Sequence, residues 1–196
     1  YKLSEIVISQ IDEGADVSGE NVDYAFDLSE FFATDEKGRF KHESKVRVFL
    51  DRLSSNEKYP FSTPELRDEL KHTFWWVGNR VASAKAMEKM LRNHPVFGDY
   101  EIILAAGDGR KLSDNDDYDQ ESDNFERNEK AFDRVQKAIK EHDKTITLSV
   151  GQLTTGVTVK EWSAVLMLTE IKSESIYTQA IFRSQNPHKY YKDGQL

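Results

Sequence analysis

Two segments in the C-terminal third of the chain carry side chains suited to binding phosphate groups. The first, SVGQLTTGVTVKEW (149–162), holds Thr154, Thr155 and Gly156, whose hydroxyls and flexible backbone offer O–H and N–H donors. The second, YTQAIFRSQNP (177–187), places Gln179 and Arg183 four residues apart, and so on one face of an expected helix. The planar cation of an arginine suits the γ-phosphate of a nucleotide. Taken singly, the first segment is better explained as a loop that turns the chain, and the second as a polar pair on a solvated helix.

The elements that must position these segments alternate between strands and helices. Continuous apolar runs predict buried strands at HTFWWV (72–77), EIILAAG (101–107), TITLSV (145–150) and WSAVLML (162–168). Apolar residues at helical spacing predict helices over 83–94, from 125 to about 142, and over 175–185, with Ser83 as the N-cap of the first. This alternation indicates an α/β fold with an open, mostly parallel sheet and helices on both faces. Ligands bind such sheets at the carboxyl ends of the strands. The first candidate segment runs directly from the end of the strand at 145–150, and the second comes after the strand at 162–168.

The first 70 residues lack the regular alternation of strands and helices seen in the rest of the sequence. We expect residues 1–70 to form a connector or accessory segment that packs against the sheet. The pattern there predicts a strand near the start, a short amphipathic helix over 45–53, and a helix capped by Thr63 with Pro64 at its first position. Residues 71–196 are then the main domain. Within it, the stretch 111–124 is acidic and nearly free of apolar residues, and we expect a mobile loop.

Composition narrows the classes of function. The chain has 196 residues, a net charge of −8 and no cysteine, which excludes disulfides and thiolate chemistry. No apolar run approaches the roughly 20 residues that cross a bilayer, so we expect no membrane partner and a cytoplasmic location. Six acidic residues between 114 and 123 account for most of the net charge, and no two histidines have metal-binding spacing, so no metal site is expected.

Taken in order, the two segments resemble motifs V and VI of superfamily 2 helicases, especially the translocase subunits of type I and type III restriction enzymes. LTTGVTVKE (153–161) is similar to motif V, and QAIFR (179–183) is similar to the Gln-x-x-x-Arg opening of motif VI. HTFWWVGNRVASAKAM resembles the first strand and helix of the second RecA-like domain in that family. The resemblance covers roughly 71–189 and implies a RecA-like form of the predicted sheet.

The resemblance also implies an ATP site formed jointly by two domains. In the family, ATP and Mg²⁺ sit in a cleft between two RecA-like domains, and the first domain carries the phosphate loop. This chain contains no Gly-x-x-x-x-Gly-Lys-Ser/Thr sequence and begins at Tyr1, so we expect a fragment that lacks the first domain and is inactive alone. The implied ATP contacts are Thr155, Gly156, Gln179 and Arg183, with Arg183 catalytic. The implied nucleic-acid contacts, to DNA with RNA as the alternative, are Asn79, Arg80, Gln152 and Thr154.

Two departures from the family pattern leave other functions open. Asn186 stands where motif VI usually has its second Arg, and Thr158 stands where motif V commonly has Asp. The chain could therefore be an inactive RecA-like scaffold or nucleic-acid-binding module. A third interpretation is a small-molecule enzyme of flavodoxin-like architecture that uses GDG (107–109) or GQLTTG (151–156) as a phosphate nest.

Overall fold

The structure is a computed structural model that describes residues 27–78, 80–105, 121–150, 158–171 and 173–185. For 121–128 and for Arg183 it describes the backbone only. The predicted strand near the start of the chain lies outside these residues, as do 111–120 of the expected acidic loop.

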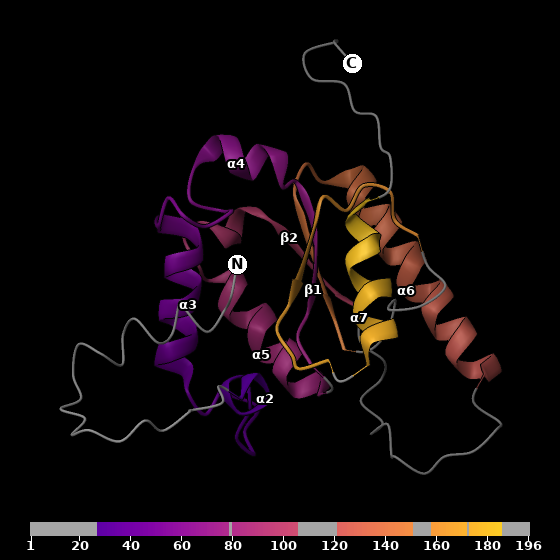
Figure 1. Ribbon diagram of the computed structural model, residues 1–196, viewed down its shortest axis with the longest axis horizontal. Helices are drawn as coiled ribbons and strands as arrows, with labels where there is room; N and C mark the ends of the chain where they lie inside the picture. Colours follow the sequence, from indigo (N-terminus) through magenta and orange to yellow (C-terminus); the bar gives the residue numbers. More distant parts are fainter. Residues whose placement is uncertain (1–26, 79, 106–120, 151–157, 172, 186–196) are drawn as a thin grey trace.

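A four-stranded parallel sheet forms the centre of the fold (Figure 1). Its strands are β1 (His72–Trp76), β2 (Glu101–Ala105), β3 (Thr145–Ser149) and β4 (Ala164–Met167), in the spatial order β2-β3-β1-β4. β1 lies between β3 and β4, and all three pairings are parallel. The four strands fall within the apolar runs from which they were predicted, and the predicted α/β class with an open parallel sheet is confirmed.

Helices cover both faces of the sheet. α5 (Val81–Arg92) connects β1 to β2 on one face (Figure 1). α6 (Glu121–Glu141) connects β2 to β3 on the other face, and α7 (Glu174–Ile181), which follows β4, lies on the same face as α6. A short 3-10 helix, η2 (Phe182–Gln185), follows α7. The connection from β1 to β2 runs toward the β2 edge of the sheet, and the connection from β2 to β3 runs back in the opposite direction. Because both crossovers are right-handed, they must pass over opposite faces of the sheet.

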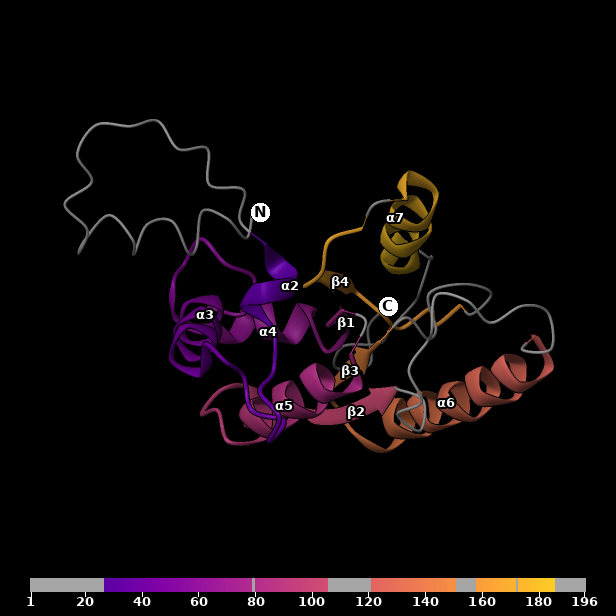
Figure 2. The ribbon, with the colours of Figure 1, turned by 90° about the horizontal axis from the view of Figure 1, so that it is seen from below.

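The residues before β1 lie on the α5 side of the sheet (Figure 2). They form α2 (Leu28–Phe31), α3 (Glu43–Ser55) and α4 (Pro64–Glu69), and a 3-10 turn, η1 (Phe97–Asp99), completes this side. The Thr63 hydroxyl accepts a hydrogen bond from the Leu66 amide at 3.3 Å, with Pro64 at the first position of α4. The helix predicted over 45–53 and the cap at Thr63 are therefore both confirmed.

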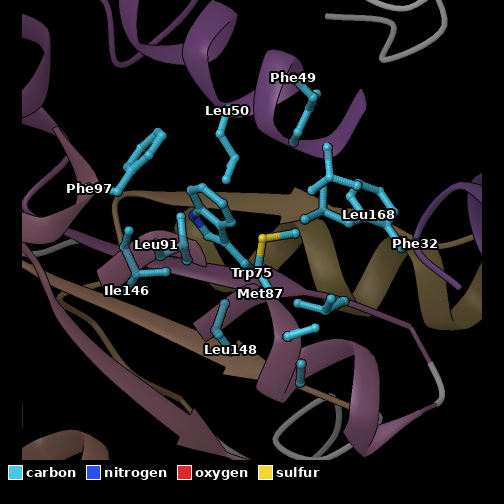
Figure 3. Close-up of a cluster of buried hydrophobic side chains, with 14 of the residues drawn as sticks. Phe32, Phe49, Leu50, Trp75, Met87, Leu91, Phe97, Ile146, Leu148 and Leu168 are labelled. Atoms are coloured by element: carbon cyan, nitrogen blue, oxygen red, sulfur yellow. The ribbon is translucent and has the colours of Figure 1, made fainter. Parts of the chain in front are cut away.

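Each face of the sheet has its own apolar core. On the α5 side, Trp75 lies beneath α3 and α5 and contacts Phe97, with ring centroids 5.4 Å apart (Figure 3). Its indole N–H donates to the Thr73 hydroxyl at 3.0 Å, which satisfies a buried polar group on the same face of β1. On the α6 side, Phe74 packs against Trp162 at 4.6 Å.

Two local predictions were wrong. The N-cap of α5 is Arg80 rather than Ser83, because the Ser83 hydroxyl instead donates to the Phe32 carbonyl at 2.8 Å in a buried tertiary contact. The loop expected over 111–124 is too long, since residues 121–124 already belong to α6. Residues 121–124 carry no apolar side chain, so the periodicity used to predict helices could not detect this first turn of α6.

Candidate functional site

The carboxyl edge of the sheet has the topology that creates a ligand-binding crevice. After β1 the chain enters α5, whose Met87 and Leu91 are buried in the core of that face. After β3 and β4 it passes to the opposite face, where Val159 and Ala180 are buried. β1 therefore lies between two strands whose continuations leave to the other side. Ligands of open α/β sheets bind at such switch points.

A small cavity of about 140 Å³ lies at this edge, between the ends of β1 and β4 and the start of α2. Gly78 lies two residues after the end of β1 and has a φ of +106°, a conformation that favours glycine. A Cβ on Gly78 would lie 3.6 Å from the Thr169 hydroxyl oxygen, so the two segments approach closely. The cavity is well below the roughly 300–1,000 Å³ of drug-sized ligand sites, so it suits one small group rather than a whole nucleotide. Its lining residues are Leu28, Ser29, Phe32, Val77, Gly78, Arg80, Ser83, Leu168 and Thr169.

Arg80 is the predicted nucleic-acid contact that the structure describes best. It is exposed, lines the cavity and occupies the N-cap position of α5 in an extended backbone conformation. Its cation is thus available at the carboxyl edge of the sheet. The other predicted nucleic-acid contacts, Asn79, Gln152 and Thr154, lie outside the described residues.

The segment that resembles motif V is attached to the core at both ends. Val150 is buried directly after β3, and the chain rejoins the core at Val159, which has no exposed surface. Thr158, which stands in place of the family's usual Asp, is exposed. Thr155 and Gly156, the predicted ATP contacts of this segment, lie outside the described residues and remain predictions.

The segment that resembles motif VI forms α7 and η2. The Ser173 hydroxyl accepts a hydrogen bond from the Ile176 amide at 3.4 Å and so caps α7. Gln179 is exposed, and its side-chain amide donates to the Ser175 hydroxyl at 3.5 Å. Because the α-helix ends at Ile181, the step from Gln179 to Arg183 passes into the 3-10 turn η2. The Arg183 side chain lies outside the description, so its predicted role is untested.

α7 and η2 also present an apolar surface that was not anticipated. Ile176, Tyr177 and Phe182 are 38%, 48% and 57% exposed, and they are the large exposed hydrophobic residues among those described. Ala180 is the buried residue of α7 and belongs to the apolar core on the α6 side of the sheet. Tyr and Phe side chains are enriched at protein–protein interfaces. The signal was present in the sequence, since Ile176 and Tyr177 lie four and three residues before Ala180 and widen the apolar stripe of the helix beyond it.

Among the described residues, no three histidines, aspartates or glutamates cluster as a metal ion would require. In the same parts of the chain, no helix is long and apolar enough to cross a membrane.

Comparison with known proteins gives one significant similarity. The chain is 33% identical over 161 residues to a Mycoplasma pneumoniae protein provisionally named as the C-terminus of a type II restriction enzyme and methyltransferase. The alignment covers 76% of this chain but 20% of that protein, so the chain spans about a fifth of its relative's length. No protein-family model and no solved structure matches the chain. The similarity is therefore to a protein named as a restriction enzyme and methyltransferase.

Proposed function

We propose that this chain is the second RecA-like domain of an ATP-dependent nucleic-acid helicase or translocase, with DNA as its substrate, that serves a restriction system. The observation that carries the proposal is the order of segments around the sheet. The segment similar to motif V follows β3, and the segment similar to motif VI follows β4, in the parallel sheet where ligands bind at strand ends. Similarity to a protein named for restriction and methylation supports the setting.

The exposed surface of α7 is what half of an inter-domain cleft requires. In the proposed motor, the first RecA-like domain of the same polypeptide supplies the phosphate loop and holds Mg²⁺, and α7 and η2 lie against it. Tyr177 and Phe182, which are about half exposed here, would then be buried by that domain. A helix that packs on its own sheet through Ala180 leaves most of its surface for such a partner.

Arg183 would act when the cleft closes on ATP. Phosphoryl transfer depends on positioning and charge stabilisation, so a guanidinium delivered to the γ-phosphate can contribute about 10³ to 10⁵ in rate. Thr155 and Gly156 would donate hydrogen bonds to the nucleotide, and Gln179 would contact it from the same helical segment as Arg183. Arg80, at the carboxyl edge near the start of α5, would contact the nucleic-acid backbone.

The proposal is tested by Arg183→Ala in the complete enzyme. We expect nucleic-acid-stimulated ATP hydrolysis to fall by about 10³-fold or more, because the transition-state charge loses its partner. Arg183→Lys keeps a positive charge without the planar fork and should recover only part of the loss. Arg134→Ala on the exposed surface of α6 removes a comparable cation and should leave turnover unchanged. Unchanged turnover in Arg183→Ala rejects the assignment.

A second candidate is a RecA-like scaffold that keeps the fold without the motor. Thr158 and Asn186, which replace an acid and a base of the family motifs, favour it. The two functions are separated by the intact wild-type protein, because a scaffold would hydrolyse no ATP with either DNA or RNA present.

A further inference from the structure

A basic groove lies along α5 and shares no lining residue with the cavity at the carboxyl edge. The turn at 37–40 runs beside α5 (Figure 2). Together with the start of α3, the turn and α5 line a volume of about 540 Å³. We call it the α5 groove. Its lining residues are Lys37, Gly38, Arg39, Phe40, Glu43, Arg47, Ala82, Lys85, Ala86, Lys89, Met90 and Asn93.

The charge of the α5 groove is opposite to that of the chain. Five of its lining side chains are cationic and one is a carboxylate, in a protein whose net charge is −8. The cations come from three separate elements, the turn, α3 and α5. Overall composition favours acidic surfaces, so this local reversal indicates an anionic ligand.

The turn that forms one wall is held rigidly. The Asp35 carboxylate accepts hydrogen bonds from the amides of Lys37 and Arg39, both at 2.9 Å, and pairs with the Arg39 guanidinium at 2.9 Å. Gly38 turns the chain with φ of +71°. Thr34 and Phe40 form a β-bridge across the base of the turn. Lys37 and Arg39 are therefore presented beside α5 by a preformed loop.

Three cations of the groove are available to a ligand, namely Lys37 of the turn and Lys85 and Lys89 of α5. Arg39 and Arg47 are engaged by Asp35 and Glu43, whereas Lys85 and Lys89 are exposed and form no ion pair with a described residue. Four residues apart, Lys85 and Lys89 lie on one face of α5 with a rise of about 6 Å between them. Between the cations, the small residues Ala82 and Ala86 allow a ligand backbone to approach the helix closely.

We propose that the α5 groove binds the sugar-phosphate backbone of nucleic acid, as a contact surface separate from the carboxyl edge of the sheet. The choice of nucleic acid as the occupant rests on the proposed function. Phosphate groups are contacted by Lys and Arg side chains and by other hydrogen-bond donors, and such contacts need no apolar anchor. A protein partner would instead need exposed aromatic or large apolar anchors, and the aromatic residue of this groove, Phe40, is only 4% exposed.

The test is the salt dependence of oligonucleotide binding by the full chain. Fluorescence anisotropy with a mixed-sequence duplex, from 50 to 200 mM salt, gives the slope of log K against log salt. In the Lys85→Gln/Lys89→Gln double variant we expect this slope to become shallower by about 1.8, since each lost phosphate contact removes about 0.9. The matched control is Lys130→Gln/Lys140→Gln, two exposed lysines of α6 with the same total charge change. Its slope should equal that of the wild type.

Three outcomes overturn the proposal. They are no binding by the wild type at 50 mM salt, an unchanged slope in the α5 variant, and an equal change in both variants, which would reflect net charge alone. Binding of poly-glutamate that depends on Lys85 and Lys89, without such dependence for the duplex, would assign the groove to an acidic protein instead. Failure of the proposed helicase or translocase function is a separate result. In that case the intact protein would hydrolyse no ATP, while the salt slopes of the variants would still differ as described.

Discussion

His94 is a buried side chain whose two ring nitrogens both form hydrogen bonds. Its side chain is 5% exposed. Nδ1 accepts from the amides of Val96 and Phe97, at 3.2 and 3.3 Å, so the proton of the neutral ring resides on Nε2 and is donated to the Asp51 carboxylate at 3.1 Å. This arrangement connects α3 to the end of α5. Burial lowers the pKa of His94 below its ordinary value of 6.5, and the hydrogen bond and charge of Asp51 oppose that shift.

The lowered pKa of His94 predicts a loss of stability in mild acid. The unfolded chain binds the proton more readily than the folded chain, so the contribution of neutral His94 is complete above about pH 6.5 and is lost as the pH falls through the folded-state pKa. We expect the urea midpoint to decrease from pH 7.5 to pH 5, and to decrease less in His94→Gln, which does not titrate. His142→Gln, at an exposed position, is the control. A pH dependence equal in the wild type and His94→Gln would contradict this assignment.

At the scale of elements, the exit of β1 depends on the backbone of Gly78. With φ of +106°, Gly78 adopts a conformation that side-chain-bearing residues rarely occupy, although a Cβ would meet Thr169 only at ordinary contact distances of 3.6 and 3.8 Å. We expect Gly78→Ala to lower the free energy of unfolding by about 1–3 kcal/mol, through backbone strain rather than collision. In a double-mutant cycle measured by urea denaturation, Thr169→Ala should therefore not rescue it, and the coupling should stay within about 0.5 kcal/mol. Rescue by Thr169→Ala would show that collision is the cause.

The elements were predictable wherever the signal was local. Continuous apolar runs located all four strands, and the Thr63-Pro64 pair located the start of α4, because burial and capping act over a few residues. Ser83 was misassigned as a cap because its partner, the Phe32 carbonyl, lies 51 residues away in the sequence. The α5 groove was missed for the same reason, since Lys85 and Lys89 resemble a solvated helical face until the turn at 37–40 lies beside them. Arg80 was predicted as a site residue, but no sequence pattern indicated the cavity that it lines.

At the scale of the whole molecule, the segment before β1 and the sheet share one core. Phe49 of α3 is 2% exposed, lies 5.8 Å from the ring of Phe32, and belongs to the same buried cluster as Trp75 and Leu148 of the sheet (Figure 3). Because apolar packing is continuous between these parts, we expect them to unfold together.

Phe49→Ala tests this cooperativity. Removing a buried Phe costs about 3–5 kcal/mol, which lowers the melting temperature of a chain of this size by about 10 °C. The three tryptophans, Trp75, Trp76 and Trp162, lie in the sheet or against it and report its unfolding by fluorescence, whereas far-UV circular dichroism reports the helices on both faces. Both transitions should shift by the same amount and remain coincident in the variant. A helical transition that moves while the tryptophan transition stays in place would mean that the segment before β1 unfolds independently of the sheet.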